Sequence, residues 1–235
     1  MGDLAFDAVF LDAGGVLVSP LPHRVTAALA SLGVDVDPEG LLHAHYRGMH
    51  AVDLARSDPE YFGDYYGGYL SHFGYDPVEH ADLVVAATAA LDAEWAAGEL
   101  WVHPVPGAAE GLALLAETGV PLVVVSNADG TVERLLGASG LVQVGPGPGV
   151  ELKAIIDSGA VGVAKPDPRI FEIALDVVQV PPDRVLHIGD AFSYDVGGAR
   201  AAGIHPALVD PLDLRPDLDC HRIDSLAQVG SLLRG

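Results

Sequence analysis

The stretch Ala8-Val9-Phe10-Leu11-Asp12-Ala13-Gly14-Gly15-Val16-Leu17 places a carboxylate directly after a short apolar run. An apolar run of this length is typical of a strand buried on both faces, so residues 8–11 predict a strand of a parallel sheet. Ligands of open α/β sheets bind beyond the carboxyl ends of the strands. Asp12 is therefore a candidate nucleophile or metal ligand, with a plain strand-end cap as the alternative. Gly14 and Gly15 allow the backbone to approach a ligand closely.

The chain of 235 residues is strongly acidic, with a net charge of -21, and half of its residues are hydrophobic. The apolar content is sufficient for a sizeable core, whereas the negative charge argues against nucleic acid or an anionic membrane surface as a partner. No apolar stretch reaches the roughly 18 residues of a membrane span. The single cysteine, Cys220, excludes an internal disulfide, and the N-terminus has no signal-peptide pattern. We therefore expect a cytoplasmic protein, either a monomer or a homodimer.

Residues 21–98 lack strand signals and carry apolar residues at helical spacing, which predicts an insertion of about four helices. Its middle is rich in aromatic residues and histidines, and we expect most of them to form the insertion's own core; a substrate pocket is the alternative. A metal site of His43, His45 and His50 is disfavoured, because no acidic or cysteine partner occurs at ligand spacing. The residues concerned are His43, His45, Tyr46, His50, Tyr61, Phe62, Tyr65, Tyr66, Tyr69, His72, Phe73 and Tyr75.

From residue 106 onward, apolar runs of strand length alternate with helical segments, which predicts βαβ units and a parallel sheet. Asp167 and Pro168 are typical of a helix N-cap and first helical residue, and Asp129 or Thr131 could cap an earlier helix. The expected strands are 120–125, 161–163, 185–188 and 205–209; the expected helices are 107–117 (ended by Gly119), a segment running through Leu136, 169–178, a segment that contains Asp195 and ends at Gly203, and 225–233; residues 145–149 are expected to form a surface loop.

Polar side chains lie at or just beyond the ends of four expected strands: Asp12, Ser126, Lys165 and Asp190. Because the carboxyl ends of parallel strands meet at one edge of a sheet, we expect these side chains to form one site. Lys165 is one of only two lysines, the other being Lys153. A lysine supplies a compact point charge that arginine does not reproduce, so its position here is informative.

These motifs, in this order, resemble the haloacid dehalogenase (HAD) superfamily of hydrolases, in the helical-cap group called subfamily I. The motifs are Asp12 in a D-x-G-G-V-L loop, Ser126-Asn127, Lys165-Pro166-Asp167-Pro168, and Gly189-Asp190 with Asp195 in a G-D-x-x-x-x-D pattern. The resemblance covers nearly the whole chain. It implies an α/β fold: a Rossmann-like three-layer core with a parallel sheet, from residues 1–19 and 99–235, and an inserted cap domain of the four-helix-bundle type, from residues 20–98.

The resemblance further implies a phosphatase that acts on a small phosphorylated metabolite through an aspartyl phosphate, with one Mg²⁺ as cofactor. In this scheme Asp12 attacks phosphorus, while Ser126 and Lys165 stabilise the phosphoryl oxygens. Asp195 would orient a metal-bound water or hold Lys165. The implied site residues are Asp12, Ser126 and Lys165 for catalysis, Gly15 and Asn127 for substrate binding, and Asp12, the carbonyl of Gly14, Asp190 and Asp195 for the metal.

Gly14 departs from the pattern of most phosphatases of the family, which carry a second Asp at this position. That Asp protonates the leaving group and later activates water, a contribution of typically about 10²- to 10⁴-fold. Its loss is serious for an alkyl phosphate, whose leaving alkoxide is strongly basic, and nearly irrelevant for an acyl or aryl phosphate. A cap residue such as a histidine could replace it. Val16, in place of the common Thr, is a minor change.

Three other functions remain open at this stage. A 2-haloacid dehalogenase also lacks the second Asp, but it needs no metal and would leave Asp190 and Asp195 unexplained. A phosphonate-cleaving hydrolase would need a cap lysine, and residues 21–98 contain none. A binding or regulatory module that keeps the fold would explain Gly14, although the joint presence of the other site residues argues against it.

Overall fold

The computed structural model describes residues 5–57 and 64–233, which belong to two compact units. A sheet unit comprises Met1–Val18 and Pro104–Gly235, and a helical unit comprises Ser19–His103. Two short strands, β2 (Val18–Pro20) and β3 (Trp101–Pro104), pair with each other where the chain passes between the units. Among the described residues, no helix combines the length and the apolar character that a bilayer crossing requires.

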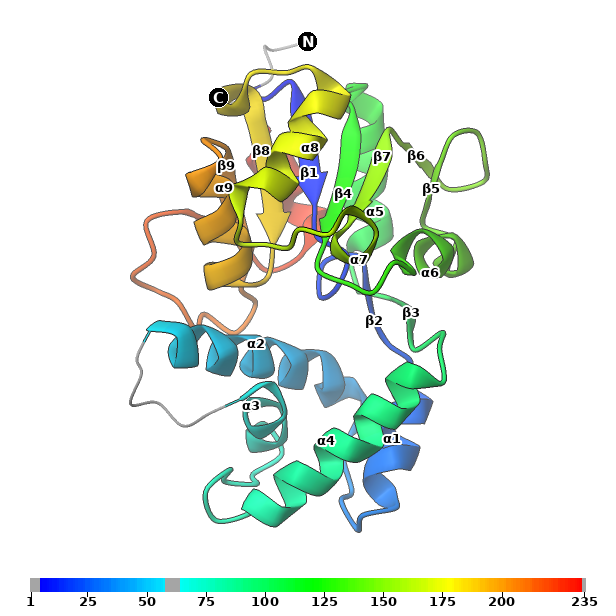
Figure 1. Cartoon of the computed structure of the whole chain (residues 1–235), viewed down its shortest axis with the longest axis vertical. Helices are drawn as coiled ribbons and strands as arrows, with labels where there is room; N and C mark the ends of the chain where they lie inside the picture. The colour runs from blue at the N-terminus through cyan, green and yellow to red at the C-terminus, as the bar shows by residue number, and fades with distance from the viewer. Residues whose placement is uncertain (1–4, 58–63, 234–235) are drawn as a thin grey trace. The chain divides into compact units, whose positions relative to one another are not determined.

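The sheet unit is built on a parallel sheet, as the alternation of strands and helices predicts. Its described residues form six strands in the order β10-β9-β8-β1-β4-β7 (Figure 1). All neighbouring strands in this sheet are parallel. β1 is a central strand, so its side chains are buried on both faces. The strands are β1 (Ala8–Leu11), β4 (Leu122–Ser126), β7 (Ala154–Asp157), β8 (Val185–Gly189), β9 (His205–Val209) and β10 (His221–Ile223).

Helices pack on both faces of this sheet, which gives the three layers. α8 and α9 lie in front of the sheet in Figure 1, and α5 lies behind it. Alternate residues of the strands, such as Phe10 and Val123, pack against Ile170 and Phe171 of α8. The helices are α5 (Ala108–Thr118), α6 (Val132–Ser139), α7 (Ser158–Val161), α8 (Pro168–Val178) and α9 (Gly197–Ala201), with shorter turns η2 (Pro182–Arg184), η3 (Phe192–Val196, π-helical) and η4 (Leu226–Ser231).

Local signals account for the helix ends that were predicted correctly. The Asp167 side chain accepts a hydrogen bond from the N–H of Arg169, and Pro168 begins α8, because a proline needs no hydrogen-bond donor at that position. Gly119 ends α5 with φ of 73°, a left-handed conformation that glycine adopts without strain.

The strand predicted at residues 161–163 is wrong. Residues Ser158–Val161 form the short helix α7, and the strand beside β4 is β7, which ends at Asp157. The Asp157 carboxylate accepts a hydrogen bond from the N–H of Gly159 at 2.9 Å and so begins the helix at the end of the strand. The same carboxylate accepts from the N–H of Val132 at 3.1 Å at the start of α6, whereas the side chain of Thr131, at the N-cap position, makes no capping hydrogen bond.

Two further expectations differ from the structure. β9 is followed by β10, and the last helical segment is the short 3-10 helix η4, so the predicted helix 225–233 is shorter and tighter than expected. Residues 145–149 form a loop as expected, but the loop connects two three-residue strands that the sequence did not indicate. These strands, β5 (Val142–Val144) and β6 (Val150–Leu152), pair in parallel outside the main sheet, and such short runs carry little periodic signal.

The helical unit forms its own core, as expected for most of its aromatic residues. Tyr69 is buried in this core, and Tyr65, Tyr66, Phe73 and Tyr75 pack against it. Tyr61 and Phe62 lie outside the described residues. The described helices of this unit are α1 (Pro22–Ala30), α2 (Leu41–Ser57), α3 (Tyr65–Ser71) and α4 (Ala81–Ala96), with a short turn η1 (Pro38–Gly40) between α1 and α2.

Candidate active site

Asp12 lies at the carboxyl end of β1, between two neighbouring strands. Leu11 pairs with Val124 of β4 and with Ile188 of β8. The backbone N–H of Asp12 donates to the carbonyl of Ile188 at 2.9 Å, which continues the sheet up to the carboxylate. The side chain accepts a hydrogen bond from the N–H of Ala13 at 2.7 Å. The sheet register therefore places Asp12 at the same edge as the ends of β4 and β8.

The loop after Asp12 is a compact turn that depends on glycine at residue 15. Gly15 has φ of 66°, and its N–H donates to the carbonyl of Val18 at 3.0 Å. The N–H of Leu17 donates to the carbonyl of Ala13, which closes the turn from the other side. The predicted substrate contact of Gly15 stays a prediction, and its N–H already has a partner within the loop.

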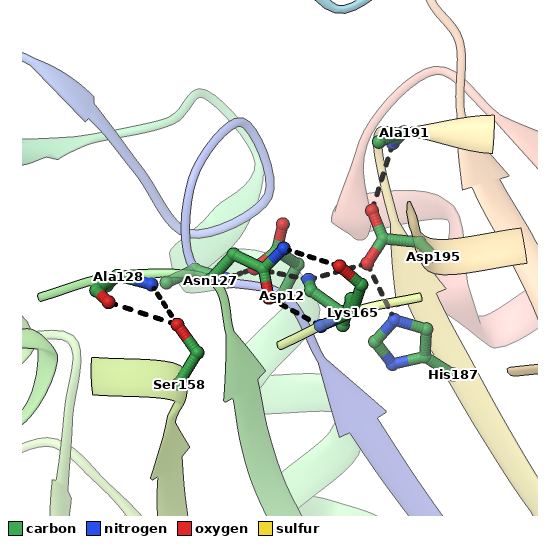
Figure 2. Close-up of polar contacts among 9 residues, drawn as sticks. Asp12, Asn127, Ala128, Ser158, Lys165, His187, Ala191 and Asp195 are labelled. Atoms are coloured by element: carbon green, nitrogen blue, oxygen red, sulfur yellow. Dashed lines mark hydrogen bonds and ion pairs between the residues drawn. The ribbon is translucent and has the colours of Figure 1, made fainter. Parts of the chain in front are cut away.

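Lys165 contacts two carboxylates, Asp12 at the end of β1 and Asp195 in η3 (Figure 2). Its Nζ atom lies 3.0 Å from Oδ1 of Asp12 and 2.6 Å from Oδ1 of Asp195. The lysine is only 3% exposed, so this ammonium is compensated by protein groups and hardly by water. Such an arrangement holds the cation beside Asp12, where charge would develop in phosphoryl transfer.

Asn127 binds the backbone of Lys165. Its Nδ2 atom donates to the Lys165 carbonyl at 2.9 Å, and its Oδ1 atom accepts from the Lys165 N–H at 2.7 Å. The side-chain amide thus makes both of its described hydrogen bonds to one residue of a distant loop. Asn127 was expected to bind substrate; in the structure its side chain holds Lys165 in place.

Asp195 is surrounded by three donors. Its Oδ1 atom accepts from Lys165 and lies 2.9 Å from Nε2 of His187, while its Oδ2 atom accepts from the N–H of Ala191 at 3.0 Å. Of the two roles expected for Asp195, holding Lys165 is the one for which the structure shows the contact. A Cβ atom at Gly189 would lie 2.1 Å from Cγ of Asp195, so only glycine leaves room for this carboxylate.

Ser126 is the last residue of β4. The loop that follows it forms hydrogen bonds with residues at the end of β7. The N–H of Ala128 donates to Oγ of Ser158 at 2.9 Å, and this hydroxyl donates back to the Ala128 carbonyl at 3.0 Å (Figure 2). The N–H of Gly130 donates to Asp157 at 2.9 Å. Sequence reasoning missed Asp157, Ser158 and His187; for His187, the polar residue inside an apolar strand was a usable signal.

The carboxylates of Asp12, Asp190 and Asp195 form a candidate metal site. One oxygen from each lies within 4.8 Å of the others, and this is the only such group of three or more His, Cys, Asp or Glu side chains in the described part of the chain. Asp12 and Asp190 each keep 9% of their surface exposed, whereas Asp195 is fully buried. The disfavoured site of His43, His45 and His50 does not form such a group among the described residues; Nδ1 of His45 lies 2.8 Å from the Tyr65 hydroxyl.

The electrostatics of this cluster favour a bound cation. Burial raises the pKa of Asp12 to about 7; Lys165 opposes this effect, and the carboxylates of Asp195 and Asp190 add to it. The Lys165 ammonium is the cation that acts on Asp12, because burial lowers the pKa of the neighbouring His187 and keeps its ring neutral. A set of three carboxylate oxygens fits a hard divalent ion such as Mg²⁺, which prefers oxygen ligands.

Lys165 and Asp195 are held in their charged forms. Burial alone would lower the pKa of Lys165, but the carboxylates of Asp12 and Asp195 more than reverse this effect and raise it. Burial alone would raise the pKa of Asp195, but the Lys165 ammonium and the His187 hydrogen bond hold it below its usual range. Both groups therefore remain ionised at neutral pH, whereas the protonation of Asp12 changes near pH 7.

Comparison with known proteins gives consistent results. A family model described as haloacid dehalogenase-like hydrolase matches residues 6–203. The chain is 36% identical over 139 residues to haloacid dehalogenase-like hydrolase domain-containing protein 3 of Bos taurus, which covers 58% of this chain and 52% of that protein. It is 38% identical over 113 residues to a phosphoserine phosphatase of Thermus thermophilus, covering 46% of this chain and 42% of that enzyme. The chain thus spans about half the length of the curated relatives it matches.

The fold has close counterparts among solved structures. A dehalogenase crystallised with an intermediate complex superimposes with a TM-score of 0.61 over 100% of both chains, at 20% sequence identity. At this level of identity the similarity supports the fold of the sheet and helices and says nothing about the reaction.

Proposed function

This chain belongs to the haloacid dehalogenase-like hydrolases, and we propose that within them it is a Mg²⁺-dependent phosphatase that forms an aspartyl phosphate on Asp12. The observation that carries the proposal is the ion pair of Lys165 with Asp12, at 3.0 Å, beside the cluster of three carboxylates. The similarity to a relative named phosphoserine phosphatase supports a phosphate ester as substrate. The acidity of the chain is compatible with a small phosphorylated metabolite rather than nucleic acid.

Asp12, Asp190 and the carbonyl of Gly14 would hold the Mg²⁺. When bound, the ion would screen the repulsion between the Asp12 carboxylate and the incoming phosphoryl group. Asp190 is suited to this role because it is partly accessible and lies in the carboxylate cluster. Asp195, which is buried among three donors, would act through Lys165 instead.

Asp12, Lys165 and Ser126 would each act in the transfer of the phosphoryl group. A carboxylate oxygen of Asp12 forms a bond to phosphorus while the bond from phosphorus to the leaving oxygen breaks. Lys165 and the Ser126 hydroxyl donate hydrogen bonds to the phosphoryl oxygens and stabilise the charge that develops there. Water then attacks the phosphorus of the aspartyl phosphate while the bond between phosphorus and the Asp12 oxygen breaks. Inorganic phosphate and a proton leave to solvent, and the Asp12 carboxylate is restored.

Gly14 limits the substrates that this site can process quickly. A glycine offers no proton to the leaving oxygen, so substrates whose leaving group departs without protonation are favoured, namely acyl and aryl phosphates. The helical unit, which corresponds to the cap of the family, would select the substrate and could supply the missing acid from one of its histidines.

Two alternatives make different predictions. A 2-haloacid dehalogenase would also tolerate Gly14, and it would release halide without a metal. A binding or regulatory module would bind Mg²⁺ or phosphate without turnover. The carboxylate cluster favours the phosphatase over the dehalogenase, since a halide displacement leaves Asp190 without a role.

The experiment that tests the proposal is hydrolysis of p-nitrophenyl phosphate and acetyl phosphate, with Mg²⁺ and with EDTA, beside halide release from 2-chloropropionate. We expect turnover of both phosphates that requires Mg²⁺. Metal-independent halide release would instead identify a dehalogenase. Absence of any turnover, together with Mg²⁺ binding by calorimetry, would identify the binding module.

A further inference from the structure

His187 is a buried polar residue that has no role in the proposed phosphatase reaction. It lies on β8 with no exposed surface, in a strand whose other side chains are apolar. Its ring packs edge-on against Phe171 of α8, with ring centroids 4.9 Å apart and planes at 80°. Burying an imidazole is costly unless its polar atoms are satisfied, so the contact that it makes deserves an explanation.

That contact is with the carboxylate that holds the catalytic lysine. Nε2 of His187 lies 2.9 Å from Oδ1 of Asp195, the same oxygen that accepts from Lys165 at 2.6 Å. The other oxygen accepts from the backbone N–H of Ala191 at 3.0 Å. Two donors on one oxygen and one on the other determine the plane of the carboxylate, and only the imidazole approaches from within β8 (Figure 2).

We propose that His187 is a positioning residue that orients Asp195, so that Asp195 holds the Lys165 ammonium at a fixed place beside Asp12. The proposal rests on the phosphatase function proposed above. His187 touches neither substrate nor the reacting atoms, and it acts through two successive hydrogen bonds.

The expected consequence is on the chemical step and not on substrate binding. Without the imidazole, Asp195 keeps Lys165 and Ala191 as partners but loses the donor that determines its rotation. The ammonium then moves relative to Asp12 and to the place where the phosphoryl oxygens gain charge. Removal of a residue that orients a functional side chain through a hydrogen bond typically lowers activity about 10- to 100-fold. We therefore expect kcat to fall while KM changes little.

A matched pair of substitutions tests this inference. In H187Q, the glutamine amide nitrogen can lie where Nε2 lies and can donate to Asp195. In H187N, an otherwise similar amide is one methylene shorter and does not reach that position. His205 lies on the neighbouring strand β9 with an exposed side chain, so H205Q and H205N are the controls for the same exchanges.

The first readout is independent of activity. The chain has two lysines, so ¹⁵N-lysine labelling yields signals from Lys165 and Lys153 alone. The buried Lys165 ammonium exchanges its protons slowly and should give an Nζ signal, while the hydrogen-bonded backbone amide of Lys153 serves as the internal reference. We expect the Lys165 signal to shift or broaden in H187N and to stay near the wild-type position in H187Q.

The inference is overturned if folded H187N keeps the wild-type Lys165 signal and a kcat within twofold of wild type. A wild-type measurement covers the case in which the variants do not fold: ¹⁵N imidazole spectra should show the proton of His187 on Nε2. The opposite tautomer could not donate to Asp195 and would refute the proposal. If wild-type protein hydrolyses no phosphate, the proposed function fails, whereas the lysine and imidazole spectra still decide whether His187 positions Asp195.

Discussion

Lys165 forms an ion pair with Asp12, its Nζ atom lying 3.0 Å from Oδ1 of the carboxylate that follows β1. The pair joins the first strand of the sheet to the loop before α8. It also determines how the candidate nucleophile behaves, because the ammonium partly offsets the effect of burial on the pKa of Asp12. Most of the following predictions depend on this pair and on the carboxylates around it.

Replacing Asp12 by asparagine should abolish turnover and leave the fold intact. The amide has nearly the same shape but cannot form an acyl phosphate. Loss of a nucleophile lowers kcat by roughly three orders of magnitude or more. Hydrolysis of p-nitrophenyl phosphate with Mg²⁺ measures the effect, and circular dichroism checks the fold. Substantial turnover by a folded D12N protein would contradict the aspartyl-phosphate mechanism.

The stabilising effect of Mg²⁺ should depend on pH. Because the pKa of Asp12 is raised to about 7, its ionised form is disfavoured in the metal-free folded state. The contribution of Asp12 to the free energy of unfolding therefore falls as the pH rises from the ordinary pKa of an aspartate toward about 7. Mg²⁺ binds the ionised form, so we expect a larger rise in Tm at about pH 8 than at about pH 5.5.

Thermal unfolding with and without Mg²⁺ at the two pH values provides this measurement. D12N is its control, since the variant lacks the titrating carboxylate and should show a smaller difference between the two conditions. An equal rise in Tm at both pH values for the wild-type protein would mean that Asp12 does not take part in metal binding.

Replacing Gly14 by aspartate should raise turnover of alkyl phosphates if the missing acid limits the reaction. A general acid contributes typically about 10²- to 10⁴-fold, and an acyl phosphate gains little because its leaving group needs no proton. The measurement is the ratio of kcat/KM for glycerol phosphate to that for acetyl phosphate. G14N is the matched control, with the same size and no acid. A ratio unchanged in a Mg²⁺-binding G14D protein would indicate that the helical unit supplies the acid or that the reaction is a different one.

Replacing Lys165 by methionine should destabilise the protein, because it leaves two buried carboxylates without their cation. Breaking a buried pair on one side costs about 3–5 kcal/mol. The raised pKa of Lys165 means that its contribution is fully present at neutral pH, where the lysine is charged in the folded and the unfolded state.

Urea unfolding at about pH 7.5 and about pH 5 tests this prediction. The loss of unfolding free energy caused by K165M should be smaller at the lower pH, because Asp12 becomes neutral in acid. K153M is the control at the exposed lysine and should change stability by no more than about 0.5 kcal/mol. A K165M protein as stable as K153M would show that the ion pair contributes nothing to folding.

Two glycine-to-alanine substitutions should have opposite effects. A Cβ atom at Gly189 would meet Asp195 at 2.1 Å, so G189A should destabilise the protein by about 2 kcal/mol or more and displace the carboxylate. Gly137 lies inside α6 with open space around it, so G137A should stabilise by about 0.5–1 kcal/mol. Thermal or urea unfolding compares them, and a tolerated G189A would refute the close packing around Asp195.

Local patterns were sufficient for the central part of the fold. The apolar run before Asp12, the runs that became β4 and β8, and the Asp167-Pro168 start of α8 each contain their own signal. An apolar run of only three residues contains no such signal, because so few apolar residues suit a strand or a helix equally well. Residues 161–163 were assigned wrongly for this reason, since the decisive group was the Asp157 carboxylate that caps α7.

The sequence by itself determined a parallel α/β sheet unit, an inserted helical region, and an edge at which Asp12, Ser126 and Asp190 lie at or just after the ends of strands. Those conclusions follow from periodicity and from the rule that parallel strands end at one edge. Lys165 reaches this edge from the loop before α8 and not, as the sequence had predicted, from the end of a strand. Only the tertiary structure decided which group each side chain contacts. Asn127 binds the backbone of Lys165 across 38 positions, and Asp195 binds its ammonium across 30. Contacts over such separations arise when packed strands and loops bring distant residues together, and no local pattern encodes them.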